Sequence, residues 1–331
     1  MGVAAALIFG VVAGAVIPLQ TAVNSRLAGR LGAILLASLV SFAVGTAALA
    51  LALVAVGVPL PLAETAAAQP WWIWIGGVCG LVFLTMNIVL LPRIGASATV
   101  ILPLVGQVFG GLLIDAVGGF GAPFHPLTLV RGLGAALVVG GAVLVNRVQP
   151  GPDLPQKPGN PGPVRAMRTQ RPPIARFVRG SRPASGGGHP LLWAAAVGIG
   201  GLGAVQTAVN GRLGQVMGSG LAAALVSFAV GLAGLAVICL ATRQRLRRSG
   251  ALRPWHFAGG LLGAAFVLVN AINAPILGTS LAVSVTLLGQ VAIGLFFDHN
   301  GWMGVPRRPA TWVRVLGAVV VLAGVALVRL G

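Results

Sequence analysis

The sequence predicts an all-α integral membrane protein with ten transmembrane helices, arranged as two inverted five-helix repeats. Three observations support this fold class. The 331-residue chain is 57% apolar and only 8% charged, with a mean hydropathy of +0.96, whereas soluble domains carry about 25% charged residues. The chain also contains an internal duplication. Finally, its basic residues are distributed unevenly between the loops, which predicts the orientation of the spans.

The duplication is clearest in two short segments. Residues 20–27 (QTAVNSRL) return 186 positions later as 206–213 (QTAVNGRL), and residues 37–45 (ASLVSFAVG) return as 223–231 (AALVSFAVG). Fifteen of these seventeen positions are identical, which chance does not explain. A duplicated, apolar chain is typical of transporters with two related halves. The match continues at an offset of 183 in the pairs Pro92/Pro275, Gly106/Gly289, Gln107/Gln290, Asp115/Asp298 and Arg131/Arg314.

Each copy contains five apolar runs long enough to cross a bilayer as helices, which takes about 20 residues. The N-terminus has no basic region before its first run, so this run is expected to be a retained span. The predicted domains are a first membrane repeat (1–148), a linker (149–190) and a second membrane repeat (191–331). The predicted spans are 3–23, 33–57, 71–91, 96–117 and 129–146, followed by 191–209, 219–240, 255–274, 279–297 and 312–329.

The segment between the copies has a different composition. From 148 to 190 it holds ten prolines and seven Lys or Arg residues. Such a segment does not form a packed core and is predicted to be an extended linker. Its positive charge predicts a cytoplasmic position beside anionic lipid headgroups.

The arginines predict which ends of the spans face the cytoplasm. With the N-terminus outside, Arg26, Arg30 and the basic linker lie inside, while only Arg131, Arg212 and Arg329 lie outside. The positive-inside rule therefore favours a periplasmic position for both termini. Because each copy has an odd number of spans, the two copies cross the membrane in opposite orientations.

Amide side chains within the spans are the candidate solute-binding groups. Gln107 and Gln290 lie in the fourth spans, and Asn87 and Asn270 lie late in the third spans. An amide in hydrocarbon needs a hydrogen-bond partner, so these side chains should face the bundle interior or a wet cavity. Two interpretations remain open: the amides bind a solute near the midplane, or they join the helices to one another.

A second set of amides lies near the ends of the first spans. Gln20 and Asn24 are four residues apart on one helical face, as are Gln206 and Asn210. They either line a substrate path or form a structural cluster at the helix end.

Two of the four acidic residues, Asp115 and Asp298, lie near the ends of the fourth spans, before glycine-rich turns. An acid within a membrane is costly and often functional, so both are candidates for proton or cation coupling. The alternative is a helix-end acid that is bonded to turn amides or to an arginine, with Arg131 and Arg314 as the candidate partners.

Several function classes are disfavoured by what the sequence lacks. Its one lysine, Lys157, lies in the linker, so there is no Walker A motif. The histidines, cysteines and acids are not spaced as metal ligands, and no nucleophile–base arrangement is visible. No basic face is interleaved with aromatic residues, as nucleic-acid binding would require. We therefore expect no enzyme activity, no cofactor, no metal and no nucleic-acid partner.

Four segments together carry a resemblance to a known family: PLQTAVNSRL (18–27), VSFAVG (40–45), WWIWIGGV (71–78) and the G-Q…D…G pattern of 106–118. The chain resembles the YdcZ family of the drug/metabolite transporter superfamily, as two five-span units fused in tandem. The resemblance implies a bacterial inner-membrane exporter of small molecules, related to the ten-span EamA-like transporters. It also implies that the first four spans of each copy line a central cavity.

The function expected from these features is secondary transport, with export of a small organic metabolite or drug-like solute by alternating access. The alternatives are a non-transporting membrane scaffold or accessory subunit, and a passive channel. The expected partners are a small-molecule solute and membrane lipid, and a homodimer remains open.

Overall fold

The computed structural model describes residues 2–94, 96–146, 190–244, 246, 251–300 and 310–331, and the linker therefore lies outside the described residues. Within this part of the chain the regular structure is entirely helical, which confirms the predicted all-α class. The helices before the linker are α1 (Val3–Leu31), α2 (Ile34–Val56), α3 (Leu62–Ala68), α4 (Gly76–Ile94), α5 (Ala96–Val117) and α6 (Leu129–Asn146). Those after it are α8 (Pro190–Val216), α9 (Gly220–Ala241), α10 (Ala258–Leu277), α11 (Thr279–Asn300) and α12 (Trp312–Leu330).

Each predicted span coincides with one of these long helices, and the main differences lie at the ends. Helix α1 continues to Leu31 and α8 to Val216, about two turns beyond the predicted ends. The polar residues of these turns lowered the local hydropathy, but they do not break a helix. Helix α1 ends at Gly32, which has a φ of 71° and donates its N–H to the carbonyl of Ala28.

The third span of each copy begins later than predicted. A 3₁₀ turn, η1 (Trp71–Trp74), precedes α4, and η3 (Pro254–Phe257) precedes α10. The apolar tryptophans favoured inclusion of these turns in the spans, although hydropathy does not distinguish a 3₁₀ turn from an α-helix. The short helix α3 was not predicted, because seven residues are too few for a periodic pattern.

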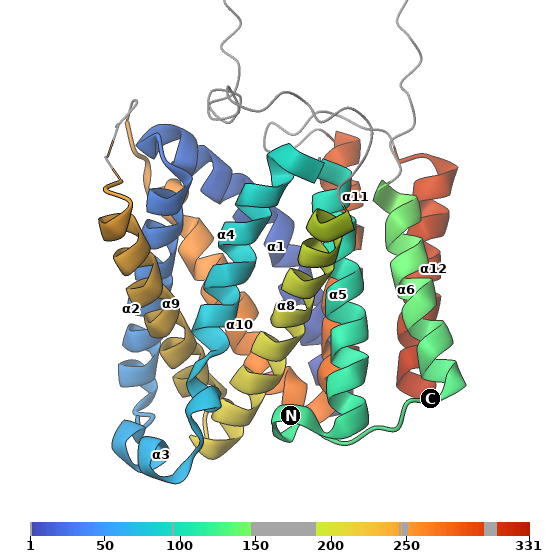
Figure 1. Ribbon diagram of the computed structural model, residues 1–331, viewed down its shortest axis with the longest axis horizontal. Coiled ribbons are helices and arrows are strands. Elements are labelled where there is room, and N and C mark those ends of the chain that lie inside the picture. Colours follow the sequence, from blue (N-terminus) through green and yellow to red (C-terminus); the bar gives the residue numbers. More distant parts are fainter. Residues whose placement is uncertain (1, 95, 147–189, 245, 247–250, 301–309) are drawn as a thin grey trace, which may run out of the picture.

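The helices before the linker pack mainly against helices after it. Helix α1 contacts α10 and α11, whereas α8 contacts α4 and α5. Helix α2 packs against α9, and α6 packs against α12 at one edge of the bundle. Figure 1 shows α1 rising from the end of the bundle at which both termini lie, whereas α8 descends from the opposite end.

The repeated VSFAVG segments pack against each other where α2 meets α9. The rings of Phe42 and Phe228 stack with centroids 4.9 Å apart. Each ring lies over the glycine of the other segment, because a Cβ at Gly45 would collide with Phe228 and a Cβ at Gly231 would collide with Phe42. The same short sequence thus supplies both the protruding ring and the space that receives it.

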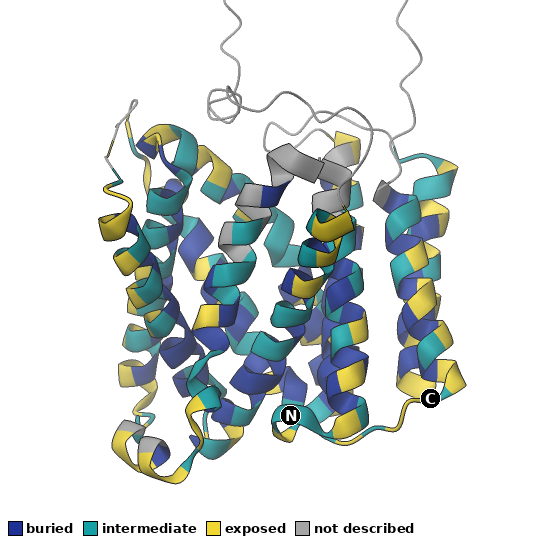
Figure 2. Ribbon diagram, in the orientation of Figure 1, coloured by how far each residue is buried: buried dark blue, intermediate teal, exposed yellow. Residues whose placement is uncertain are grey.

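The outer surface of the bundle is apolar. Figure 2 shows buried residues along the helix faces that meet one another, and exposed residues on the outward faces. The exposed side chains include Leu51, Val54, Leu129 and Leu240, each at least 72% exposed. A continuous apolar exterior of this kind is unfavourable in water and favourable in lipid. Seven described helices are long and apolar enough to cross a membrane, and two shorter apolar segments, 101–117 and 129–145, accompany them.

Candidate functional site

A cavity of about 140 Å³ lies among six helices, four of which bear its polar lining. Its polar side chains come from α5, α8, α10 and α11, and its apolar side chains include two phenylalanines. The side chains that line it are Ile17, Phe83, Gln107, Gln206, Thr207, Asn210, Phe266, Val267, Asn270, Val283, Thr286 and Gln290, beside the backbone of Gly203. The structure therefore brings together five of the eight predicted amides, from helices on both sides of the linker.

Three glutamines of this cavity have no hydrogen-bond partner among the residues that the structure describes. Gln107, Gln206 and Gln290 line the cavity, and none of them makes a hydrogen bond with another described residue. The three side chains are half-buried and face the cavity, and polar groups inside a protein are almost always hydrogen-bonded to protein or to water. Amides that join helices would be paired with each other or with the backbone, so these three are better placed to bind a solute.

The glycine before each fourth-span glutamine brings a neighbouring backbone close. A Cβ at Gly106 would collide with the carbonyl oxygen of Val197 on α8, and a Cβ at Gly289 would collide with that of Val11 on α1. Gln107 packs on Gly203 of α8. A Cβ built on Gly203 would lie 3.1 Å from the Cγ of Gln107. Close approach of helices at a glycine is common in membrane bundles. Here it determines the positions of Gln107 and Gln290 relative to the neighbouring helices.

Asn270 lines the same cavity but is bonded locally. Its Nδ2 donates to the carbonyl oxygen of Phe266 at 2.9 Å, and its Oδ1 accepts from Thr286 Oγ1 at 3.5 Å. The Asn270 side chain is thus held mainly by its own helix, and its NH₂ group is less available for a solute than those of the glutamines. Its counterpart Asn87 lies on α4, and its side chain lies outside the described ones.

The first-span amides pack into the Gly-x-x-x-Gly faces of the other copy. A Cβ at Gly259 of α10 would collide with Asn24 Oδ1, and a Cβ at Gly263 would lie 2.6 Å from Gln20 Nε2. Asn210 and Gln206 of α8 have the same relation to Gly76 and Gly80 of α4. Asn24 and Gln20 are absent from the described lining of the cavity. The extended α1 and α8 place these residues within helices, not at the helix ends that the sequence predicted.

Asp115 is fully buried at the end of α5 and bonds to a different helix. Its Oδ1 accepts from the backbone N–H of Thr279 at 2.7 Å, and its Oδ2 accepts from the N–H of Ser280 at 2.9 Å and from Ser280 Oγ at 2.6 Å. These N–H groups are the first two of α11, so Asp115 caps that helix and interacts with the positive end of its dipole.

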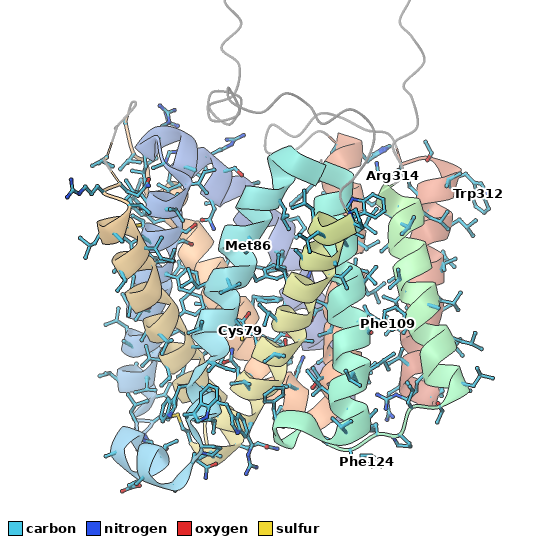
Figure 3. The ribbon with its side chains drawn as sticks, viewed as in Figure 1. Cys79, Met86, Phe109, Phe124, Trp312 and Arg314 are labelled. Atoms are coloured by element: carbon cyan, nitrogen blue, oxygen red, sulfur yellow. The ribbon has the colours of Figure 1, made fainter. Side chains whose placement is uncertain are left out.

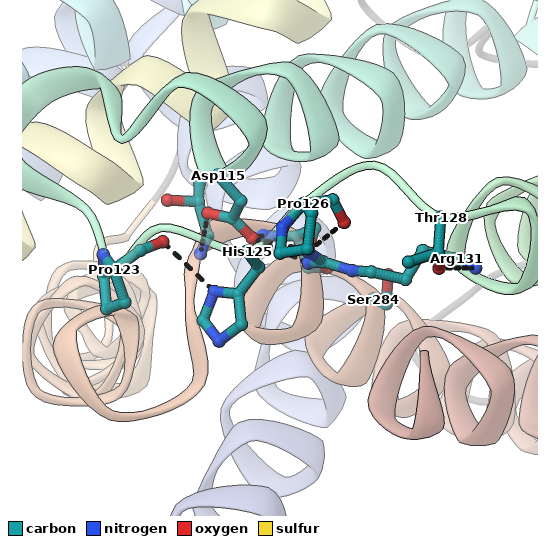
Figure 4. Close-up of polar contacts among 9 residues, drawn as sticks. Asp115, Pro123, His125, Pro126, Thr128, Arg131 and Ser284 are labelled. Atoms are coloured by element: carbon teal, nitrogen blue, oxygen red, sulfur yellow. Dashed lines mark hydrogen bonds and ion pairs between the residues drawn. The ribbon is translucent and has the colours of Figure 1, made fainter.

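Arg131 completes this network (Figure 4). Its Nη2 lies 3.1 Å from Asp115 Oδ2 and donates to Ser280 Oγ at 2.6 Å, while its Nη1 donates to the carbonyl of Pro126. The turn before α11 leaves little space, since a Cβ on Gly278 would lie 3.0 Å from Asp115 Oδ2. Gly278 also has a φ of 78°, which glycine tolerates best. These contacts favour the structural alternative for Asp115. The side chain of Asp298 lies outside the described ones.

Some lining residues were missed by the sequence analysis. Phe83 and Phe266 are 183 positions apart, the same offset that relates Gln107 to Gln290. A search for all repeated large side chains would have found this pair. Thr207 matches Thr21 in the repeated segment and could have been found in the same way, whereas Thr286 gave no such signal, because its counterpart at the offset of 183 is Pro103. Among the described residues, no group of three or more His, Cys, Asp or Glu is placed to hold a metal ion.

Aromatic side chains at the surface lie near both ends of the bundle. Figure 3 shows Trp312 at the start of α12 and Phe124 in the loop before α6, at opposite ends of the molecule and both directed outward. They are 75% and 66% exposed. Aromatic residues at these two levels are typical of membrane–water interfaces.

Comparisons with known proteins agree on one family and one fold. The family model described as "Putative inner membrane exporter, YdcZ" matches residues 5–144 and residues 191–327. "Inner membrane protein YdcZ" of Escherichia coli (strain K12) is 28% identical over 145 residues, which are 43% of this chain and 94% of the relative. A solved structure described as "Crystal structure of protein" is similar with a TM-score of 0.65 and 15% identity, over 98% of this chain and 95% of that chain. At that identity, the likeness concerns the fold.

Proposed function

Because the chain belongs to the YdcZ family of inner membrane proteins, we propose that it is a secondary transporter that exports a small organic solute by alternating access. The observation that carries the proposal is the cavity in which Gln107, Gln206 and Gln290 meet without partners of their own. Amides left unpaired in a membrane protein are unfavourable unless a solute or water binds them.

The proposed architecture is ten membrane spans in two inverted repeats, 1–148 and 191–331, joined by a cytoplasmic linker at 149–190. The duplication, the reciprocal packing of α1 and α8, and the opposite directions of these helices support it. In such an arrangement one sequence adopts two packings, and exchange of the packings between the repeats opens the cavity to the other side. The uneven distribution of arginines supports periplasmic termini.

The decisive experiment is solute flux in proteoliposomes that contain the purified chain. A screen of metabolite export and drug resistance in overproducing cells first supplies the solute. The variant that carries Gln107→Leu and Gln290→Leu should lose at least about 90% of this flux, because it removes two of the amides that line the cavity without a described partner. Gln244→Leu is the matched control, since Gln244 lies beyond the end of α9 and its side chain bonds only to Thr242 among the described residues.

Three results would contradict the proposal in different ways. Normal flux in the double variant would remove these glutamines from the transport site. A stoichiometric protein partner together with no flux of any screened solute would favour the scaffold function. Flux that neither saturates nor shows competition would indicate a channel.

A further inference from the structure

We propose that the solute held in the cavity is a small, uncharged heterocycle that carries adjacent hydrogen-bond donor and acceptor groups, such as a nucleobase or a cyclic amide. This inference rests on the proposed function and adds the chemical class of the solute. Three properties of the cavity carry it: the charge of its lining, the chemistry of its unpaired groups, and its size and aromatic walls.

The lining argues against an ionic solute. None of the described side chains that line the cavity is charged. An ion that enters a membrane-enclosed cavity loses its hydration, and only an opposite charge compensates for this loss adequately. The buried acid on the same helix as Gln107 is Asp115, eight residues or about 12 Å further along. Asp115 is already paired with Arg131 and with the first N–H groups of α11, so it is not free to compensate a cation.

The unpaired groups argue for a solute with a donor beside an acceptor. A glutamine amide presents an NH₂ donor and a carbonyl acceptor in one plane. One such amide forms a pair of hydrogen bonds with the donor–acceptor edge of a ring, as glutamine and asparagine side chains do with adenine. Gln107, Gln206 and Gln290 offer this edge from three helices. A solute without polar groups would leave all three amides unsatisfied, which is costly.

Size and shape argue for a small, flat ring system. The cavity has a volume of about 140 Å³, similar to the roughly 150 Å³ cavity in another protein that accepts benzene. Phe83 and Phe266 occupy corresponding positions of the two copies, and both line the cavity. Together with Ile17, Val267 and Val283 they supply apolar walls, while the amides supply the polar contacts. This combination matches a flat ring with a polar edge.

The test is direct binding of radiolabelled uracil and adenine to the purified full-length chain. Three ring-sized probes test these properties: 1,3-dimethyluracil lacks the N–H donors, orotate adds a carboxylate, and N-methylpyridinium carries a permanent positive charge and no hydrogen-bonding group. We expect uracil or adenine to bind, and each of the three probes to bind at least about tenfold more weakly. A site built for hydrogen bonds rejects analogues that lack them, and an uncharged lining does not compensate for the lost hydration of an ion.

Variants locate the binding and keep the test independent of folding. Gln107→Leu with Gln290→Leu should abolish uracil binding, whereas Gln244→Leu should retain it. Gln107→Glu places a carboxylate in the cavity and should reverse the preference, so that N-methylpyridinium binds at least about tenfold more tightly than to the unchanged chain. This gain of binding cannot arise from a misfolded protein.

The inference is overturned if neither uracil nor adenine binds, or if orotate or N-methylpyridinium binds the unchanged chain as tightly as they do. Export of a charged solute that depends on Gln107 and Gln290 would also overturn it, while the proposed transport function would stand. Absence of flux for every solute would instead contradict the transport function itself.

Discussion

At the scale of single residues, amides of the same type have different surroundings in this molecule. Gln107, Gln206 and Gln290 face the cavity without partners, whereas Asn270 bonds to the backbone of its own helix. Asn24 has a third environment, because its buried Oδ1 lies against Gly259 and has no conventional hydrogen-bond partner among the described residues. The position of each side chain relative to the neighbouring helix therefore decides whether it is available for a solute.

Asp115 gives the sharpest prediction about stability. Its replacement by asparagine leaves Arg131 buried and without its counter-charge, so we expect Asp115→Asn to lower the free energy of unfolding by about 3–5 kcal/mol. Unfolding of the detergent-solubilised protein by a denaturant measures this change. Glu64→Gln is a matched acid-to-amide control, because Glu64 is exposed on α3 and its loss should change stability by less than about 0.5 kcal/mol. Equal stability of the two variants would contradict the buried ion pair.

The coupling role of Asp115 and Asp298 remains a prediction. The dependence of solute flux on a pH gradient tests it. The contacts of Asp115 favour a helix-capping role, so we expect export to follow a pH gradient equally in the unchanged chain and in the folded fraction of Asp115→Asn with Asp298→Asn. Flux in proteoliposomes with and without an imposed gradient provides the comparison. Selective loss of the gradient dependence in the variant would assign proton coupling to these acids.

At the scale of helices, the repeated motifs of the two copies fit one another reciprocally. The amides of α1 pack on the glycines of α10, and those of α8 pack on the glycines of α4. The VSFAVG segments of α2 and α9 are also reciprocal, because the phenylalanine of each segment packs on the glycine of the other. A motif that appears twice in the sequence thus forms two equivalent contacts between the copies. In each contact, one copy supplies the side chain and the other copy supplies the glycine.

Gly259→Ala tests the fit between α1 and α10. The added Cβ would fall on Asn24 Oδ1, so we expect a loss of about 1–3 kcal/mol in unfolding free energy from overpacking. Gly198→Ala on α8 is the matched control, because a Cβ there meets no atom within 4 Å. Asn24→Ala in the Gly259→Ala background should restore part of the loss. If Gly259→Ala and Gly198→Ala have the same effect, the close contact does not exist in the membrane.

At the scale of the whole molecule, transport by alternating access requires the two halves to move relative to each other. A cavity whose polar groups come from both halves changes its exposure when the halves move relative to each other. The glycines at positions 134, 141, 317 and 324 bring α6 and α12 into close contact at the edge of the bundle. This contact joins the halves at a distance from the cavity.

Labelling of single cysteines tests the opposite orientation of the halves. In a background without Cys79 and Cys239, Arg26→Cys and its counterpart Arg212→Cys should react with a membrane-impermeant maleimide from opposite sides of the membrane. We expect cytoplasmic labelling for residue 26 and periplasmic labelling for residue 212, as the distribution of arginines predicts. Labelling of both positions from the same side would falsify the inverted arrangement and the alternating-access mechanism with it.

The sequence alone determined the helical class, the approximate spans and the membrane environment, because these depend on hydropathy and on repetition along the chain. It also identified the glutamines of the fourth spans, since a polar residue inside an apolar run is visible without a structure. It did not distinguish Gln206 from its counterpart Gln20. Each packs on a glycine of the other copy, Gly80 or Gly263, but only Gln206 belongs to the described lining of the cavity. The packing of helices distant in sequence decided that difference and the pairing of Asp115 with α11. An environment of this kind depends on which atoms face a side chain across a helix interface, and local residue patterns do not contain that information.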